Sequence, residues 1–226
     1  MYITNCFRCK EVQSVPKDSL SYLRDMCASD TEELRDKTPT QFRPMMDRDA
    51  LVWLLNGNIH PRLWVKYNIQ QEVTGHVCIE LREFGSPVGW IRRKVYDGVP
   101  GPKYLVTGKK SFYGIAGSDS AVVVVEDCLS AIHVHESTGL TTVSILGTGK
   151  NLHAQVAIAS RTNNVIVWLD SDKAGTTASD KFIKEMRAYN CAVAEVCTEQ
   201  DPKKLSREEI NRNIKGATDE LGISLN

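Results

Sequence analysis

Two apolar runs that end in acidic residues stand out in the middle of this chain: AVVVVED at residues 121–127 and VIVWLDSDKAG at residues 165–175. Both runs have the length and the β-branched content of strands that are buried on both faces. Helical patterns lie between them, which predicts a parallel sheet with crossover helices. Ligands of such sheets bind outside the carboxyl ends of the strands, where these acids fall. The segment therefore predicts an α/β fold with an acidic site.

Four acidic residues are expected to meet at this edge of the sheet. Glu126, Asp170 and Asp172 follow strands that should be neighbours, and Asp201 follows a further predicted strand at residues 191–196. Carboxylates this close repel one another unless a cation lies between them. Mg²⁺ and Mn²⁺ suit such ligands and support phosphoryl or nucleotidyl transfer, which is the reaction class we predict. The alternative is that these acids cap the helices that follow the strands.

The overall composition is that of a protein able to bury a core. The chain has 226 residues, 42% of them hydrophobic, and its 28 basic and 28 acidic residues balance, so net charge selects no partner. No apolar run reaches the length of a membrane span, and the first residues lack the pattern of a signal peptide. Seven scattered cysteines do not resemble a secreted disulfide framework. We therefore expect a cytoplasmic protein with reduced thiols and no membrane partner.

Residues 1–30 contain a pair of cysteines, Cys6 and Cys9, with the spacing of half a zinc ribbon. A tetrahedral zinc site needs four ligands, which in structural sites are nitrogen or sulfur atoms. The nearby candidate thiol is Cys27, and Asp30 close behind it would be an unusual ligand. A zinc half-site and two free thiols therefore both remain open for Cys6 and Cys9.

Residues 31–116 predict a smaller α+β lobe ahead of the parallel sheet. Helical patterns occupy its first half, where Trp53 and Trp64 lie on apolar stripes that favour core positions over base stacking. Two alternating runs on either side of Gly85-Ser86 predict a β-hairpin with its turn at that pair. The lobe therefore differs in architecture from the parallel sheet that follows it.

The second half of this lobe is rich in positive charge. Between Arg92 and Tyr113 the only acid is Asp97, and aromatic residues are interleaved with the basic ones. Such a composition is typical of a groove for single-stranded nucleic acid or phosphate, and a solvated hairpin face is the alternative. The candidate binding residues are Arg92, Arg93, Lys94, Lys103, Lys109 and Lys110, together with Lys173 beside the acids.

The two acidic segments resemble the Toprim domain. The motif VVED at residues 124–127 with a following helix, and WLDSDKAG at residues 168–175, match the glutamate and the Asp-x-Asp pair that mark this family. Bacterial-type primases, type I and II topoisomerases, OLD-type nucleases and recombination mediators share the domain. The acidic motifs alone therefore leave several activities open.

Flanking segments resemble bacterial-type and phage primases in particular. Three segments resemble successive motifs of the primase amino-terminal lobe: VGWIRRK at 88–94, PKYL at 102–105 and FYGI at 112–115. The turn GT at 147–148 resembles the primase Gly-Thr turn, and QDPKKL at 200–205 resembles its Lys-Asp-Pro-Asp segment. Cys6 and Cys9 resemble the closing half of the primase zinc ribbon. These motifs follow the family's order over roughly the first 210 residues.

The resemblance implies an architecture for the whole chain. The expected parts are a partial zinc-ribbon-like segment at 1–30, an α+β lobe with a β-hairpin at 31–116, a Toprim-type parallel sheet flanked by helices at 117–205, and a C-terminal helix or tail at 206–226. The ribbon's first ligand pair is missing, which puts zinc-dependent template reading in doubt. No helicase domain is expected after residue 205.

The resemblance also implies a function, that of a phage-type DNA primase core in the host cytoplasm. Such a core joins ribonucleoside triphosphates on a single-stranded DNA template with Mg²⁺ or Mn²⁺, and needs a separate replicative helicase. A metal-dependent Toprim nuclease and a non-catalytic DNA-binding Toprim protein of recombination are the alternatives.

Individual residues acquire roles from the same resemblance. Glu126 would orient the metal-bound reacting groups, and Asp170 and Asp172 would hold the catalytic ions. Asp201 would be an outer metal ligand. Arg93 and Lys103 would contact template or nucleotide phosphate. In this reading the acids and the basic lobe face each other across one cavity.

Overall fold

The computed structural model describes residues 2–5, 12–15, 38–99, 103–108, 112–147, 149 and 151–224. The strands are β1 (Tyr2–Asn5), β2 (Val12–Val15), β3 (Ile69–Gln71), β4 (Val77–Glu83), β5 (Ser86–Arg93), β6 (Tyr104–Gly108), β7 (Tyr113–Ile115), β8 (Ser118–Val125), β9 (Leu140–Ser144), β10 (Asn164–Trp168) and β11 (Ala192–Glu195). The helices are α2 (Arg48–Asn56), α3 (Pro61–Lys66), α4 (Cys128–Thr138), α5 (Leu152–Ala159), α6 (Lys173–Ala188), the 3₁₀ helix η1 (Pro202–Lys204) and α7 (Arg207–Glu220).

Nine of these strands form one mixed sheet that runs through the whole described body. Their order is β11-β10-β8-β9-β7-β4-β5-β6, with β3 paired to β4 outside that path. The strands β11, β10, β8 and β9 are parallel, which confirms the parallel sheet expected from the two apolar runs. β1 and β2 pair separately as a two-stranded antiparallel sheet.

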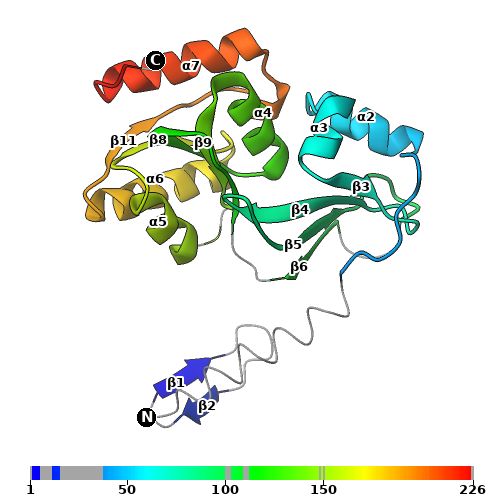
Figure 1. The fold of residues 1–226 in the computed structure, drawn as a ribbon. Helices are drawn as coiled ribbons and strands as arrows, with labels where there is room; N and C mark the ends of the chain where they lie inside the picture. Colours follow the sequence, from blue (N-terminus) through cyan, green and yellow to red (C-terminus); the bar gives the residue numbers. More distant parts are fainter. Residues whose placement is uncertain are drawn as a thin grey trace.

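Helices cover both faces of the parallel part of the sheet, whereas α2 and α3 lie on one side of the hairpin (Figure 1). In the parallel part, alternate residues of each strand point to opposite faces, because successive side chains in a strand alternate. Val123 and Ile166 belong to one buried apolar cluster with residues of α4 and α7, whereas Val122 and Val165 belong to a second cluster with residues of α5 and α6. The four-valine run is therefore buried on both sides, as its uninterrupted apolar sequence predicts.

The predicted hairpin is formed by β4 and β5, which pair antiparallel. Its two-residue turn is Phe84-Gly85, and both residues have positive φ, 51° and 104°. Positive φ at both positions is the geometry of the tight turn whose twist matches that of paired strands. The sequence prediction of a hairpin around Gly85 is thus confirmed, with the turn one residue earlier than the Gly85-Ser86 pair.

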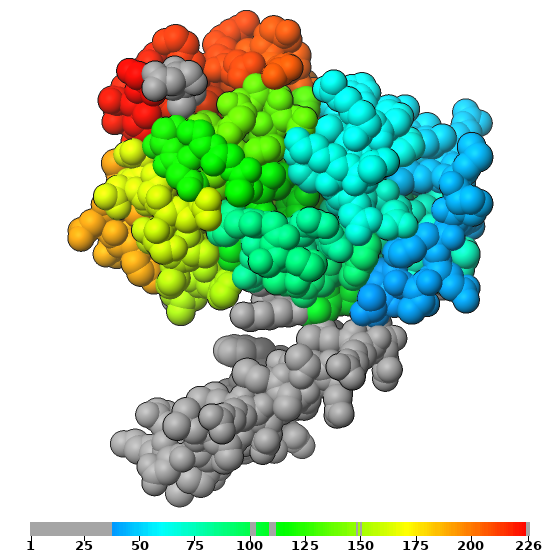
Figure 2. All heavy atoms as spheres, in the orientation of Figure 1, coloured from blue at the N-terminus to red at the C-terminus, as the bar shows by residue number. Residues whose placement is uncertain are grey.

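The N-terminal lobe and the parallel sheet are joined more closely than the sequence suggests. β7 precedes the predicted boundary at residue 116, yet it pairs antiparallel with β9 of the parallel part. It also meets β4 through the pair Glu83 and Gly114. The residues of both parts pack against each other in the space-filling view (Figure 2). One continuous sheet therefore places the hairpin next to the acidic strand ends.

Some sequence predictions fall outside the described residues. Cys6, Cys9, Lys109 and Lys110 are among them, as is the helix expected from residue 31 onward. The final predicted helix is present as α7, which begins with a capping box between Ser206 and Glu209. Among the described helices, none has the length and apolar character that crossing a bilayer requires.

Candidate functional site

Glu126 and Asp170 follow neighbouring parallel strands. The register of β8 and β10 ends with Val125 opposite Trp168, so both acids emerge at the same edge of the sheet. Their charges interact, because the charge of Asp170 helps to raise the pKa of Glu126. We call the following set the acidic edge: Glu126, Asp127, Asp170, Asp172 and Asp201.

The Glu126 carboxyl group is strongly perturbed. Its pKa is raised from 4.5 to about 7, first by burial and then by the charges of Asp170, Asp172 and Asp127, while Lys203 opposes the rise. A glutamate in this state is only partly ionised near neutral pH, and a nearby cation favours its ionised form. The crowding expected from the sequence is therefore present at Glu126.

This perturbation predicts how stability depends on pH in metal-free protein. Glu126 has a higher pKa when folded, so the folded state binds more protons, and stability falls as pH rises from about 4.5 to about 7. With solvent screening of this half-exposed group, we expect a loss of about 1–2 kcal/mol between pH 4.5 and pH 8. Urea unfolding in a chelator should show this loss, and Glu126→Gln should remove it. An unchanged loss in the variant would assign the effect to other groups.

Asp170 is held at the end of β10 without a full set of partners. Its side chain is half-buried, and its Oδ1 atom is buried with no hydrogen-bond partner among the described residues. Burial raises the pKa of Asp170, and the charge of Asp201 adds to that shift. A buried carboxylate oxygen without a donor is costly in the folded protein. It is also what a cation or a ligand hydroxyl would satisfy.

Gly175 fixes the backbone on which Asp170 lies. Helix α6 passes so near the end of β10 that a Cβ atom at position 175 would lie 2.0 Å from the carbonyl oxygen of Asp170. We expect Gly175→Ala to destabilise the protein by about 3 kcal/mol, because the overlap involves backbone. Gly216→Ala in α7 is the control, since nothing lies within 4 Å of that position and alanine favours helix. Chemical denaturation should give opposite signs for the two variants.

Asp172 caps a helix, as the alternative reading of the acids proposes, and so does Asp127. Asp172 Oδ1 accepts a hydrogen bond of 2.7 Å from the backbone N–H of Gly175 at the start of α6. Asp127 accepts from the backbone N–H groups of Leu129 and Ser130 at the start of α4. Capping does not remove their charge, because both still raise the pKa of Glu126. These residues therefore combine a structural role with a place at the acidic edge.

Lys203 is the residue of this site that sequence reasoning missed. Its Nζ lies 2.7 Å from Asp127 Oδ2 and 2.9 Å from Asp201 Oδ2. Lys204 Nζ lies 3.4 Å from the same Asp201 oxygen. Although burial raises the pKa of Asp201, the hydrogen bond and charge of Lys203 lower it below its ordinary value overall. Asp201, expected as an outer metal ligand, is thus already neutralised by lysines.

Only some of the acids of this site are suited to bind a divalent ion. Within the described ranges, no three His, Cys, Asp or Glu side chains are close enough to hold a metal ion between them. The predicted set of four carboxylate ligands is therefore divided, with Asp201 bound by lysines. Mg²⁺ needs few protein ligands, because waters and substrate phosphates complete its shell. Glu126 and Asp170, with its unpartnered oxygen, fit that requirement.

A cavity of about 390 Å³ lies between the hairpin and the start of α4. Of the acidic edge, Glu126 and Asp127 line it, whereas Asp170 and Asp172 are not among its lining residues. The expectation that the acids share one cavity facing the hairpin therefore holds for Glu126 alone among the three predicted catalytic residues. The opposite wall carries Trp53, Ile79, Ile91, Arg93, Tyr104 and Val106.

Arg93 presents a guanidinium group to this cavity. Its Cζ atom lies 4.2 Å from the centre of the Tyr104 ring and 5.8 Å from that of Trp53. Its Nε and Nη1 atoms are buried and have no hydrogen-bond partner among the described residues. Such a group is well placed to bind an anion, because guanidinium pairs with carboxylate or phosphate in two parallel hydrogen bonds. Trp53 packs against the main buried cluster, in line with the core position expected for it, and its partly buried side chain also lines this cavity.

Arg92 differs from its neighbour Arg93. The two residues point to opposite faces of β5, because side chains alternate along a strand. Arg92 Nε and Nη2 both donate to the Glu72 carboxylate, at 2.8 and 2.5 Å, and Glu72 is buried. The guanidinium group of Arg92, which the sequence predicts to bind nucleic acid, is therefore already paired with Glu72. The structure therefore places Arg92 in the framework of the lobe rather than beside the acids.

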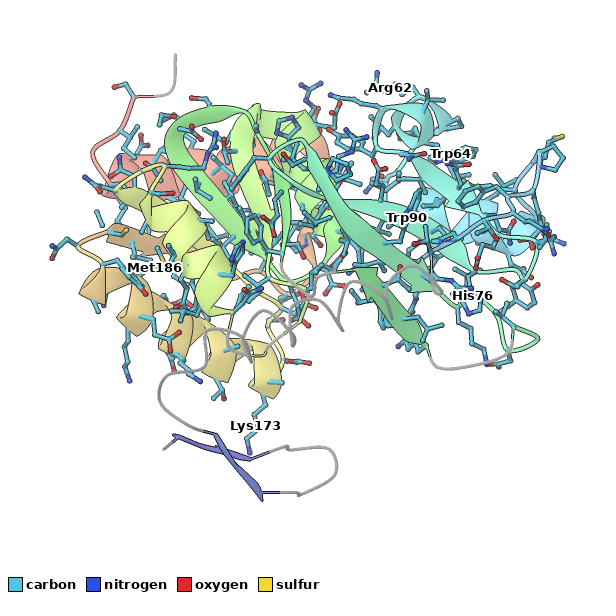
Figure 3. The ribbon with its side chains drawn as sticks, turned by 60° about the horizontal axis from the view of Figure 1, so that its bottom comes forward. Arg62, Trp64, His76, Trp90, Lys173 and Met186 are labelled. Atoms are coloured by element: carbon cyan, nitrogen blue, oxygen red, sulfur yellow. The ribbon has the colours of Figure 1, made fainter. Side chains whose placement is uncertain are left out.

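The remaining basic candidates lie near the surface. Lys94 is half-buried, and its backbone N–H donates to the carbonyl oxygen of Lys103 at 3.1 Å. Lys103 itself is exposed. Lys173 is exposed at the start of α6, where its side chain projects away from the sheet (Figure 3). These lysines could reach a long polyanion, but they do not line the cavity that contains Arg93.

Comparisons with known proteins agree with this fold. A family model described as Toprim-like matches residues 123–206. A structure of the DnaG primase catalytic domain bound to ssDNA is 16% identical with a TM-score of 0.62, covering 88% of this chain and 82% of that chain. The primase fragment of the bacteriophage T7 primase-helicase protein is 16% identical with a TM-score of 0.51, covering 95% of this chain and 90% of that chain.

A third structure is longer than this chain. The zinc-binding and RNA polymerase domains of the Aquifex aeolicus primase are 17% identical with a TM-score of 0.56, and the match covers 82% of this chain but only 55% of that one. No curated protein sequence matches. Residues 123–206 therefore form a Toprim-like domain, and the chain has the fold of the primase catalytic cores.

Proposed function

We propose that this chain is a DNA primase core, which joins ribonucleoside triphosphates into short RNA primers on a single-stranded DNA template. The observation that carries the proposal is the cavity lined by Glu126 and by Arg93; the buried Nε and Nη1 atoms of Arg93 have no hydrogen-bond partner among the described residues. A nucleotide needs both a cation at its phosphates and donors for its phosphate oxygens. The aromatic rings of Trp53 and Tyr104 add surfaces on which a base or sugar can pack.

The acidic edge would hold the divalent ion that this reaction needs. Glu126 and Asp170 would be its ligands, and Asp172 would act through its nearby charge. When bound, Mg²⁺ or Mn²⁺ lowers the pKa of a 3′-hydroxyl group and neutralises phosphate charge. Arg93 would hold a phosphate group and exclude water from it, and the exposed Lys103 and Lys173 would contact the template backbone. Lys94, Lys109 and Lys110 would extend this basic surface.

The partners that we propose are those of the proteins whose fold this chain shares. The structures that this chain resembles include a DnaG primase domain bound to ssDNA and a fragment of the T7 primase-helicase protein. A single-stranded DNA template and a separate replicative helicase would accordingly serve this chain, as in a phage replication system. Zinc bound by Cys6 and Cys9 would concern template reading rather than the joining reaction.

Primer synthesis on a mixed single-stranded template tests the proposal. The assay would contain labelled ribonucleoside triphosphates with Mg²⁺ or Mn²⁺, and would compare the wild type with Asp170→Asn. Short RNA products made only by the wild type are the expected result. Cleavage of a labelled strand without synthesis would instead favour the Toprim nuclease. Binding of single-stranded DNA that survives Asp170→Ala and Asp172→Ala, with no product, would favour a non-catalytic Toprim protein.

A further inference from the structure

Lys203 is placed among the carboxylates by contacts from distant parts of the chain. Asn58, between α2 and α3, donates a hydrogen bond of 2.8 Å from its side chain to the backbone carbonyl oxygen of Lys203. His133 Nε2 lies 2.9 Å from the carbonyl oxygen of Leu205. Pro202 is buried within the same turn. The backbone around Lys203 is therefore fixed from both the N-terminal lobe and α4.

The ammonium group of Lys203 has the contacts of a bound cation. It lies within 3 Å of carboxylate oxygens from Asp127 and Asp201, two residues 74 positions apart in the chain. Its side chain is 22% exposed, whereas that of Lys204 is 53% exposed. Its charge also acts on Glu126 and Asp170, since it opposes the rise in pKa of both. One lysine thus pairs with two of the five residues of the acidic edge and acts electrostatically on two more.

We propose that Lys203 is a built-in counter-cation of the acidic edge. Its ammonium group occupies the place that a divalent ion would otherwise take between Asp127 and Asp201, so the edge accepts a divalent ion on the Glu126 and Asp170 side only. The proposal rests on the proposed function in one respect, namely that Glu126 and Asp170 bind a metal ion. Lys203 is a positioning residue here, because it acts on the reaction through the carboxylates.

Charge balance supports this assignment. Asp127 is half-buried, caps α4 and accepts a further hydrogen bond from the hydroxyl group of Ser130. Asp201 lies at the start of η1 and is half-buried. Without Lys203, Asp127 would lose this ion pair, and Asp201 would keep the longer contact of 3.4 Å with the more exposed Lys204. Two carboxylates with so little compensating charge are the arrangement that recruits a divalent ion in proteins. The lysine removes that requirement from the folded chain.

The number of bound Mn²⁺ ions tests the proposal. Titration of the full chain with Mn²⁺, followed by the electron paramagnetic resonance of the free ion, should give one ion per wild-type chain. Lys203→Met should bind one ion more than the wild type, because the emptied place accepts Mn²⁺. Lys203→Arg and the neighbouring Lys204→Met should bind as the wild type does. Equal numbers for Lys203→Met and wild type would overturn the proposal, as would two ions in the wild type.

A second readout separates this role from simple packing. In a chelator, Lys203→Met should unfold at a lower temperature than the wild type. Adding Mn²⁺ should raise the unfolding temperature of Lys203→Met by more than it raises that of the wild type. A loss that Mn²⁺ does not restore would mean that Lys203 only packs. Failure of Lys203→Met and Lys203→Gln to fold even in Mn²⁺ would also count against the proposal, since the ion should replace the ammonium group.

The same titration distinguishes this inference from the proposed function. No ion in the wild type, with one in Lys203→Met, would support the counter-cation and oppose a metal-dependent primase. Loss of the single wild-type ion in Asp170→Asn would support the proposed site whatever Lys203 does. The two proposals can therefore fail independently of each other.

Discussion

Asp170→Asn should abolish primer synthesis and leave the folded protein at least as stable as the wild type. The buried Oδ1 atom of Asp170 has no hydrogen-bond partner among the described residues, so the charge contributes little to the framework. Burial and neighbouring carboxylates raise its pKa, so an uncharged amide should relieve repulsion there. We expect a loss of activity of about 100-fold or more, the range for removing one preorganised electrostatic contact. Primer yield and the unfolding midpoint measure the two effects.

Asp180→Asn is the matched control for this variant. Asp180 is an exposed residue of α6, the same helix that Asp172 caps, and the substitution removes one negative charge in the same way. Its activity and its unfolding midpoint should both remain close to those of the wild type. A similar loss of activity in Asp180→Asn would mean that overall charge matters. Full activity in Asp170→Asn would remove Asp170 from the mechanism.

The parts of this site that the sequence predicts are those fixed by local pattern. Strand length and β-branched content are enough to place Glu126 after β8 and Asp170 after β10, and parallel pairing then brings both to one edge. The hairpin is likewise predicted by alternation around a glycine turn. These inferences need no knowledge of how the two parts of the chain pack together.

Other features depend on tertiary contacts, and the sequence could not supply them. Lys203 lies 76 residues after Asp127 and reaches it only because η1 is held by Asn58 and His133. Strand alternation does predict that Arg92 and Arg93 face opposite sides. The antiparallel pairing of β7 with β9 docks the hairpin β4–β5 against the parallel sheet. This docking decides which face of β5 meets the acids. The local excess of positive charge in the sequence does not distinguish Arg92 from Arg93.

The same substitution should therefore have different effects at the two positions, a loss of stability at Arg92 and a loss of nucleotide affinity at Arg93. Arg92→Met leaves the buried Glu72 carboxylate without its guanidinium partner, and breaking a buried pair in this way costs about 3–5 kcal/mol. For a chain of this size, that loss lowers the unfolding temperature by about 10 °C. Glu72→Gln in the Arg92→Met background should recover part of the loss, because the unpaired charge is gone.

Arg93→Met should leave stability within about 1 kcal/mol of the wild type, since only the contacts with the Tyr104 and Trp53 rings are lost. Binding of Mg²⁺·ATP should weaken by about 10-fold to 100-fold, the value of a hydrogen bond to a charged group in a desolvated site. Calorimetric titration of the two variants measures this difference directly. Equal ATP affinity in Arg93→Met and wild type would show that the cavity does not hold the phosphates. A loss of affinity confined to Arg92→Met would reverse the assignment of the two faces of β5.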